Sequence, residues 1–169
     1  MLNLEYDYDE KIIYSVDKDG EKRIVSNDFP SEPKLSPNKK FAVYISPLEW
    51  ECYGSVYLYD LTTGAKELLV SPDEERRNIP KDVAWIDDNT LAIIIGFGDG
   101  TIQIGGNVYL YFLDKNQMKR ITYHDTSIQL TKLIFDGKNL KAEGIFYIDD
   151  QLNKFKEYSE IVDIQNYLG

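Results

Sequence analysis

The sequence contains one cysteine, Cys52, one histidine, His124, and no long hydrophobic run. A single cysteine excludes an internal disulfide and a thiolate metal cluster, because both need at least two cysteines in one chain. The longest apolar run, Leu91–Phe97, is far shorter than the roughly 20 residues of a membrane-spanning helix. These absences exclude a disulfide-linked scaffold and a helical membrane protein.

Basic residues are also scarce. The 169 residues include 19 Lys and Arg against 29 Asp and Glu, which gives a formal net charge of −10. Binding to nucleic acid or to an anionic membrane depends on clustered cations. The sequence therefore predicts neither a nucleic-acid partner nor membrane insertion. Met1–Glu5 lacks the basic and apolar segments of a signal peptide, and the sequence predicts no cellular location.

Aromatic residues are abundant, and many of them lie in a repeated hairpin pattern. The sequence has 13 Tyr and 7 Phe, which favour β-strands. Each repeat is an apolar strand followed by a turn with Gly or Asn, the residues that tolerate positive φ. The four repeats place Gly20, Gly64, Asn116 and Asn153 at these turns, after strands at Ile12–Tyr14, Val56–Asp60, Val108–Tyr111 and Ile145–Ile148.

A second kind of turn precedes three other strand-like runs. Ser36–Lys40, Ile86–Thr90 and Phe135–Asn139 are clusters of turn-forming residues. Together the two patterns define a four-stranded unit that recurs every 50 to 52 residues or so, as in a propeller blade. We expect a single all-β domain over residues 1–169, with complete units at about 33–70 and 82–122 and partial units at about 11–26 and 130–159.

Several predicted strands carry large apolar groups on both faces, as in Val56–Tyr59. Such strands need a covering layer on each side. The sequence offers only two weak helix signals, one beginning at Ser71–Glu75 and one over the last residues from Ile161 to Leu168. Sheets are therefore expected to cover sheets. Gly144 is expected to mark a bulge in a long strand from Leu140 to Asp149.

The motif Ser36–Ser46 followed by Val56–Gly64 resembles the blade repeat of TolB-like β-propellers. The longer stretch over residues 33–122 is similar to a family of uncharacterised bacterial domains. The resemblance implies antiparallel meander sheets arranged as propeller-like blades. Two complete and two partial units, with the N-terminal hairpin completing the last sheet, predict about three sheets that do not close a ring. A β-sandwich is the alternative, and exposed sheet edges would allow oligomers.

No short motif indicates catalysis. His124 and Asp125 are adjacent, and neighbouring side chains of an extended chain point apart. The loop Gly96–Gly100 is followed by a strand-like segment rather than by the helix that a phosphate loop requires. The acidic pairs lack the spacing of a calcium loop. The sequence therefore predicts no catalytic residue, no metal site and no cofactor.

The long loops at one end of the predicted blades are the candidate functional surface. They are expected to bring together aromatic and charged side chains, namely Glu49, Trp50, Glu51, Tyr53, Arg76, Arg77, Phe97, Asp99 and His124. The sequence thus favours a non-catalytic module that binds a protein, peptide or glycan. The alternatives are a hydrolase that uses loop carboxylates such as Glu49 and Glu51, a structural protein that assembles through sheet edges, and a Trp50 that merely covers the core.

Overall fold

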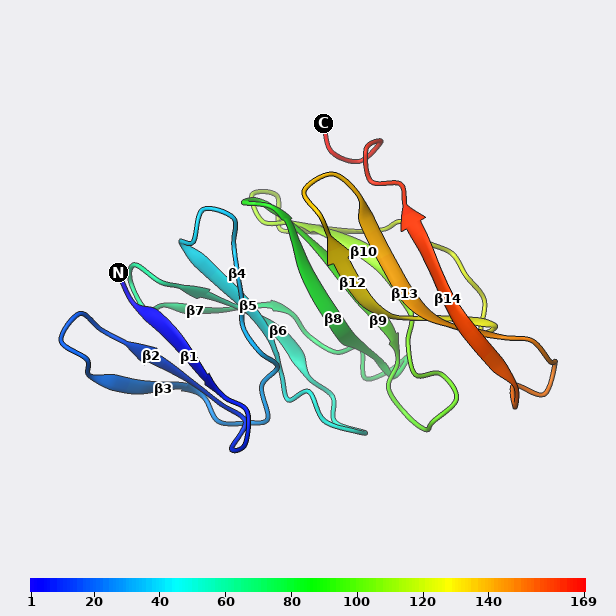
Figure 1. Cartoon of the computed structure of the whole chain (residues 1–169), viewed down its shortest axis with the longest axis horizontal. Helices are drawn as coiled ribbons and strands as arrows, with labels where there is room; N and C mark the ends of the chain where they lie inside the picture. Colours follow the sequence, from blue (N-terminus) through cyan, green and yellow to red (C-terminus); the bar gives the residue numbers. More distant parts are fainter. The chain divides into compact units, whose positions relative to one another are not determined.

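The computed structural model describes all 169 residues and contains fourteen β-strands and no helix (Figure 1). The strands form four antiparallel sheets, and none of the sheets is closed. By contacts the chain divides into two compact units, Met1–Pro72 and Asp73–Gly169. The all-β, open class is confirmed, and a single domain over the whole chain stays a prediction.

The first sheet of Met1–Pro72 corrects the expected sheet number from about three to four. Its strands are β1 (Asn3–Asp7), β2 (Ile12–Val16) and β3 (Lys22–Ser26), in that order. The Asp7 carboxylate accepts hydrogen bonds from the Asp9 and Glu10 amides at 3.0 and 2.9 Å. This turn folds β1 back onto β2, so the N-terminal hairpin gains its own third strand and is a separate sheet.

The second sheet matches the complete unit expected at about 33–70. It contains β4 (Lys34–Leu35), β5 (Phe41–Ser46), β6 (Ser55–Asp60) and β7 (Lys66–Val70). The core of this unit forms where the two sheets meet. Its buried members are Ile13, Tyr44, Tyr59 and Leu61.

Asp73–Gly169 contains the other two sheets. One is formed by β8 (Asn78–Asp87), β9 (Thr90–Phe97), β10 (Asn107–Phe112) and β11 (Gln117–Arg120). The other is formed by β12 (Ile128–Phe135), β13 (Leu140–Tyr147) and β14 (Phe155–Val162). These strands follow the expected units at about 82–122 and 130–159.

Sheets cover sheets in this unit, as the two-sided apolar strands predict. One core cluster takes Ile94 and Leu110 from the four-stranded sheet and Leu130 and Leu140 from the three-stranded sheet. Polar bonds fix the contact at two places. Gly106 and Leu130 exchange backbone bonds at 2.9 and 3.3 Å, and the Leu133 amide donates to the Asp82 carboxylate at 2.7 Å.

The two helix predictions are wrong. After Ser71, the chain makes a tight turn in which Asp73 and Asn78 exchange two backbone hydrogen bonds of 2.9 Å. Pairing of this turn with β8 outweighs the favourable helix start. At the C-terminus only one turn forms, where the Tyr167 and Leu168 amides donate to the Ile164 carbonyl at 3.0 and 3.3 Å.

Two turn details also differ from expectation. Gly20, Gly64 and Asn116 have positive φ as predicted, but the fourth turn places Leu152 there (φ 56°) instead of Asn153. The Asp149 carboxylate accepts bonds from the Asn153 and Lys154 amides, which shifts the turn by one residue. The bulge expected at Gly144 lies on the opposite strand, where Thr131 is the extra residue between Leu130 and Lys132.

Candidate functional site

The nine side chains of the predicted binding surface are divided between the two units. Met1–Pro72 contains Glu49, Trp50, Glu51 and Tyr53, and Asp73–Gly169 contains Arg76, Arg77, Phe97, Asp99 and His124. Each unit therefore carries its own part of that surface.

The loop between β5 and β6 presents Trp50 to solvent. Its side chain is 67% exposed. Glu49 and Glu51 beside it are also exposed, whereas Tyr53 is half-buried. The Cys52 amide donates to the Glu49 carbonyl at 3.1 Å, which closes the loop tip. Trp50 therefore does not cover the core, and its indole ring is free to contact a partner.

Three of the five predicted residues in the second unit lie together. The Arg77 Nε atom lies 2.8 Å from the Asp99 carboxylate, and its guanidinium lies 6.0 Å from the centre of the Phe97 ring. Arg76 does not join them. It pairs with Asp73 in its own turn at 3.3 Å.

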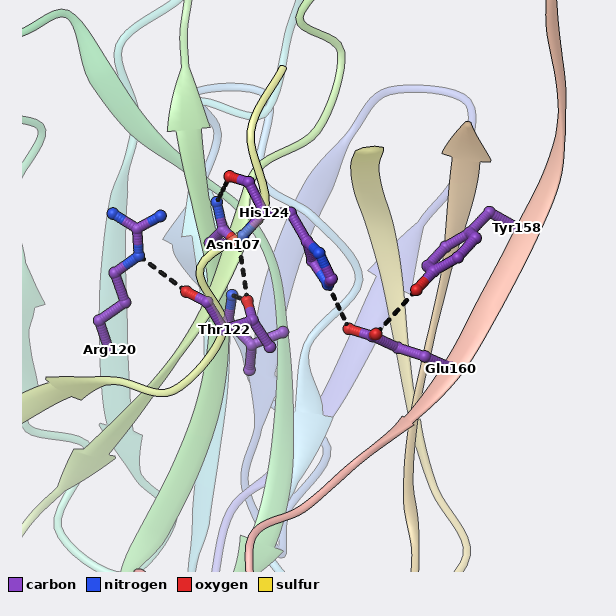
Figure 2. Close-up of polar contacts among 7 residues, drawn as sticks. Asn107, Arg120, Thr122, His124, Tyr158 and Glu160 are labelled. Carbon is purple, nitrogen blue, oxygen red and sulfur yellow. Dashed lines mark hydrogen bonds and ion pairs between the residues drawn. The ribbon is translucent and has the colours of Figure 1, made fainter. Parts of the chain in front are cut away.

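His124 joins a polar cluster that the sequence did not reveal (Figure 2). Its Nε2 atom lies 2.7 Å from the Glu160 Oε1 atom, and Tyr158 donates to Glu160 Oε2 at 2.8 Å. The His124 and Glu160 side chains are only 22% and 23% exposed. Burial, and then the bond to Glu160, raises the pKa of Tyr158. The two partners lie on β14, more than thirty residues along the chain, so no local motif could have indicated them.

Asn107 holds the segment that carries His124 in place. Its Oδ1 atom accepts bonds from the Thr122 hydroxyl at 2.8 Å and the His124 amide at 2.9 Å, and its Nδ2 atom donates to the His124 carbonyl at 3.1 Å. Thr122 in turn accepts a bond from the Val108 amide at 2.8 Å. These side-chain bonds, together with backbone bonds from the Ile121 and Thr122 amides to the Val108 carbonyl, fix the segment to the start of β10.

Arg120 is positioned by the same segment. Its Nε atom donates to the Thr122 carbonyl at 2.8 Å (Figure 2), and its guanidinium lies 4.7 Å from the centre of the Tyr123 ring. The Tyr123 side chain is itself 73% exposed. The other three arginines of the chain, Arg23, Arg76 and Arg77, each form an ion pair with a carboxylate.

A polar pocket of about 260 Å³ lies beside this cluster. Its lining includes Phe97, Asn107, Arg120, His124, Asp125 and Gln129. His124 also borders a second pocket of about 300 Å³, whose lining includes Glu160 and Tyr167. His124 therefore borders two hollows on one unit.

A larger pocket of about 510 Å³ lies in Met1–Pro72, with Glu21, Arg23, Tyr59 and Lys66 in its lining. Arg23 is already paired there with Glu21 at 3.6 Å. None of the predicted site residues lines this pocket. The smaller pocket is the better candidate site, because its lining includes the predicted residues Phe97 and His124 and an arginine, Arg120, that has no carboxylate partner.

Lys81 is a half-buried lysine near this pocket. Its Nζ atom donates to the carbonyl of Gln103, a lining residue, at 2.7 Å. Burial lowers the pKa of its ammonium group to about 8. The folded state therefore favours the neutral amine more than the unfolded state does.

Replacing Lys81 with methionine is expected to raise the free energy of unfolding at pH 7 by about 1–2 kcal/mol, because the variant avoids burying a charge. Between pH 8 and 10.5 the unfolded state binds more protons at Lys81 than the folded state. The stability of the unmodified chain therefore rises with pH across this window, and the advantage of the variant shrinks. Urea unfolding at pH 7 and pH 10.5 measures both effects. Lys132→Met, at an exposed position of β12, is the control, and an equal response of the two variants would contradict the prediction.

No group of three or more His, Cys, Asp and Glu side chains is arranged to hold a metal ion. The structure also has no helix with the length and hydropathy that a membrane span requires.

A model of a domain of unknown function, DUF4652, matches residues 5–164. The chain belongs to the DUF4652 family. No curated protein matches it. The resemblance to an uncharacterised domain family with propeller-like blades is thus confirmed.

Three solved structures are similar to the chain. A candidate conserved lipoprotein from Clostridium novyi NT is 26% identical with a TM-score of 0.71, and the match covers 79% of this chain and 86% of that one. TolB from Acinetobacter baumannii is 19% identical with a TM-score of 0.55, covering 96% of this chain and 40% of TolB. The β-propeller domain of the Trilobed protease from Pyrococcus furiosus, which has an open velcro topology, is 15% identical with a TM-score of 0.57, covering 95% and 48%. The latter two show the fold alone, and the chain spans less than half of each.

Proposed function

We propose that this DUF4652 domain is a non-catalytic binding module for a protein or peptide, and that an acidic side chain of the ligand enters the pocket beside Arg120. The proposal concerns Asp73–Gly169, where the pocket lies. The exposed Trp50 loop of Met1–Pro72 would add a second contact surface.

Arg120 is the observation that carries the proposal. In a chain with a net charge of −10, it is the one arginine without a carboxylate partner. Its Nε atom is held by Thr122 and its plane lies near Tyr123, so the orientation of its remaining donors is restricted. A guanidinium suits a carboxylate because it offers two parallel N–H groups.

The size of the pocket favours a side chain over a free small molecule. Its volume of about 260 Å³ lies just below the range of roughly 300–1,000 Å³ that is usual for small-molecule sites. Arginine and tyrosine are also the side chains that most often dominate protein interfaces. Arg120 in the pocket lining and the exposed Tyr123 ring beside it therefore fit a protein or peptide ligand.

The net negative charge of the chain does not prevent an acidic side chain from binding at this pocket. At physiological salt, charges separated by more than about 8 Å are largely screened. The lining of the pocket has one charged residue of each sign, Arg120 and Asp125. The Asp125 carboxylate is held by the amide and hydroxyl of Ser127, at 2.9 and 2.5 Å, rather than by Arg120.

Selection of a phage-displayed library of random heptapeptides against the full chain tests the proposal. We expect the selected peptides to be enriched in Asp and Glu, and Arg120→Ala to weaken their binding by about 10-fold or more, as expected for a charge-assisted hydrogen bond. Arg76→Ala, at an exposed arginine outside the pocket, is the control and is expected to change binding less than about 2-fold.

Two results would overturn the proposal. One is peptides without an excess of acidic residues, and the other is equal binding to the chain and to Arg120→Ala. A third result would also overturn it: no peptide is selected, and the chain binds acidic saccharides on a glycan array in a way that depends on Arg120. The ligand would then be an acidic saccharide rather than a peptide.

The hydrolase alternative has less support in the structure. Glu49 and Glu51 are exposed to water and lack the shielded setting in which paired carboxylates perform acid–base chemistry. The His124 ring is bound to Glu160 rather than to a hydroxyl or thiol nucleophile. The similar β-propeller domain of the Trilobed protease shares the fold alone.

A further inference from the structure

In the last sheet, no strand of this sequence lies beside the outer edge of β14. The strand order is β4-β5-β6-β7 in one four-stranded sheet and β8-β9-β10-β11 in the other. In each sheet the third strand, β6 or β10, is therefore paired with a fourth strand, β7 or β11. The sheet β12-β13-β14 has the same order but stops at its third strand (Figure 1). β14 therefore occupies the place of β6 and β10, without the strand that follows them.

The residues that follow β14 do not lie along this edge. Ile164 is buried in the core of Asp73–Gly169, and Tyr167 and Leu168 pack against the same cluster. Lys119 lies 4.9 Å from the centre of the Tyr167 ring. The segment after β14 thus turns onto the core instead of returning along the edge.

The free edge of β14 is long and regular. Its eight residues pair with β13 without a register shift. The Ile148 amide donates to the Lys154 carbonyl at 2.9 Å, which fixes the phase of the bonds between the two strands. Because bonded pairs alternate along an antiparallel ladder, the backbone groups of every second residue point outward, and these residues are Phe155, Glu157, Ser159 and Ile161.

We propose that β14 pairs antiparallel with β14 of a second copy of this chain, about a two-fold axis at Tyr158. This register places Phe155 opposite the partner's Ile161 and Glu157 opposite the partner's Ser159. Both are outward-facing pairs, as backbone bonding requires. Phe155 and Ile161 are 60% and 62% exposed in the single chain, and the pairing covers both.

The side chains on the other face are also complementary in this register. Lys156 lies opposite the partner's Glu160, so a cation faces an anion. A two-fold axis one residue away gives less favourable side-chain pairs. An axis at Glu157 places the Glu157 carboxylate opposite its own copy, and an axis at Ser159 places Glu157 opposite the partner's Ile161. The strand is thus self-complementary in one register.

Native sheets usually blunt an edge of this kind with a charge, a proline or a bulge, because it invites pairing. The outer strands β7 and β11 have only five and four residues. β14 is longer and has apolar side chains near both ends, and its three charged residues, Lys156, Glu157 and Glu160, face no like charge in this register. Pairing of two strands buries less surface area than a standard protein interface. We therefore expect a weak dimer that dissociates at concentrations of about 1 µM.

Sedimentation velocity of the full chain between about 1 and 300 µM tests the proposal. We expect a reversible monomer–dimer equilibrium. Ser159→Pro, which removes an outward N–H group, and Lys156→Glu, which opposes two carboxylates, are each expected to weaken the dimer by about 10-fold or more. Lys154→Glu makes the same charge change outside the strand and is expected to leave the dimer unchanged. Circular dichroism of each variant verifies the fold.

The register has its own test. In a Cys52→Ser background, Tyr158→Cys is expected to form an intermolecular disulfide, since residues on the axis face their own copies at a distance that a disulfide can span. Glu157→Cys, which faces the partner's Ser159, is expected to cross-link far less. A chain that stays monomeric to 300 µM would overturn the proposal, as would dimers that Ser159→Pro and Lys156→Glu leave intact.

Discussion

Replacing Tyr44 with alanine is expected to lower the free energy of unfolding by about 3–5 kcal/mol, the usual cost of removing a large buried ring. Tyr44 is 1% exposed, and its ring stacks on Tyr57 with centroids 5.5 Å apart. It belongs to the core of Met1–Pro72 together with Ile13 and Tyr59. Truncation would leave a cavity between the two sheets of this unit. Urea unfolding of the full chain at pH 7 measures the loss.

Tyr44→Phe is the matched control and has the opposite sign. The Tyr44 hydroxyl is buried and has no hydrogen-bond partner in the protein. Removing it is expected to leave stability unchanged or to raise it by up to about 1 kcal/mol, because an unpaired buried hydroxyl is costly. A Tyr44→Phe variant that is destabilised by more than about 1 kcal/mol would contradict this account.

The same residue predicts a pH effect. Burial, followed by the nearby Tyr57 and Tyr59, raises the pKa of Tyr44 well above its ordinary value of 10. Above pH 10 the unfolded state loses this proton while the folded state keeps it, so stability falls as pH rises. Tyr44→Phe removes the loss, and its advantage over the unmodified chain is expected to grow between pH 9 and pH 11.

The fold could be predicted from the sequence because its signals are local. Turns at Gly20, Gly64 and Asn116 need positive φ, and few residues other than Gly and Asn accept it. The number of sheets was harder to predict from the sequence. It depended on whether the N-terminal hairpin would gain a partner strand, and the bonds of Asp7 that bring β1 onto β2 carry no strong signal of their own.

The candidate site could be predicted only in part. His124 was identified because it is the sole histidine, and Trp50 because it interrupts two acids in a long loop. Glu160 and Tyr158 were missed because their approach to His124 depends on how the β12-β13-β14 sheet packs against the loop after β11. Arg120 was missed because the sequence does not show which arginines form ion pairs. The structure pairs the other three with carboxylates and leaves Arg120 without one.

Replacing Gly144 with alanine is expected to destabilise the chain by about 2–3 kcal/mol, the upper range for overpacking. A Cβ atom at this position would lie 1.9 Å from the Gln129 carbonyl oxygen and 2.9 Å from the Leu130 Cα atom. Both neighbours are backbone, so no side-chain rotation relieves the clash. The strands β12 and β13 must separate next to the bulge at Thr131. Gly169→Ala makes the same chemical change where a Cβ meets nothing within 4 Å, and it is expected to be neutral.

The Gly144 variant also connects stability to the pocket. Gln129 is buried, accepts a hydrogen bond from the Gly105 amide at 3.1 Å and lines the pocket beside Arg120. A shift of its backbone would move this side chain and the loop that it holds. Gly144→Ala is therefore expected to weaken peptide binding even at temperatures where the variant stays folded. Urea unfolding and peptide titration on the same samples measure both effects, and a variant with unchanged stability would show that the strands can separate here without cost.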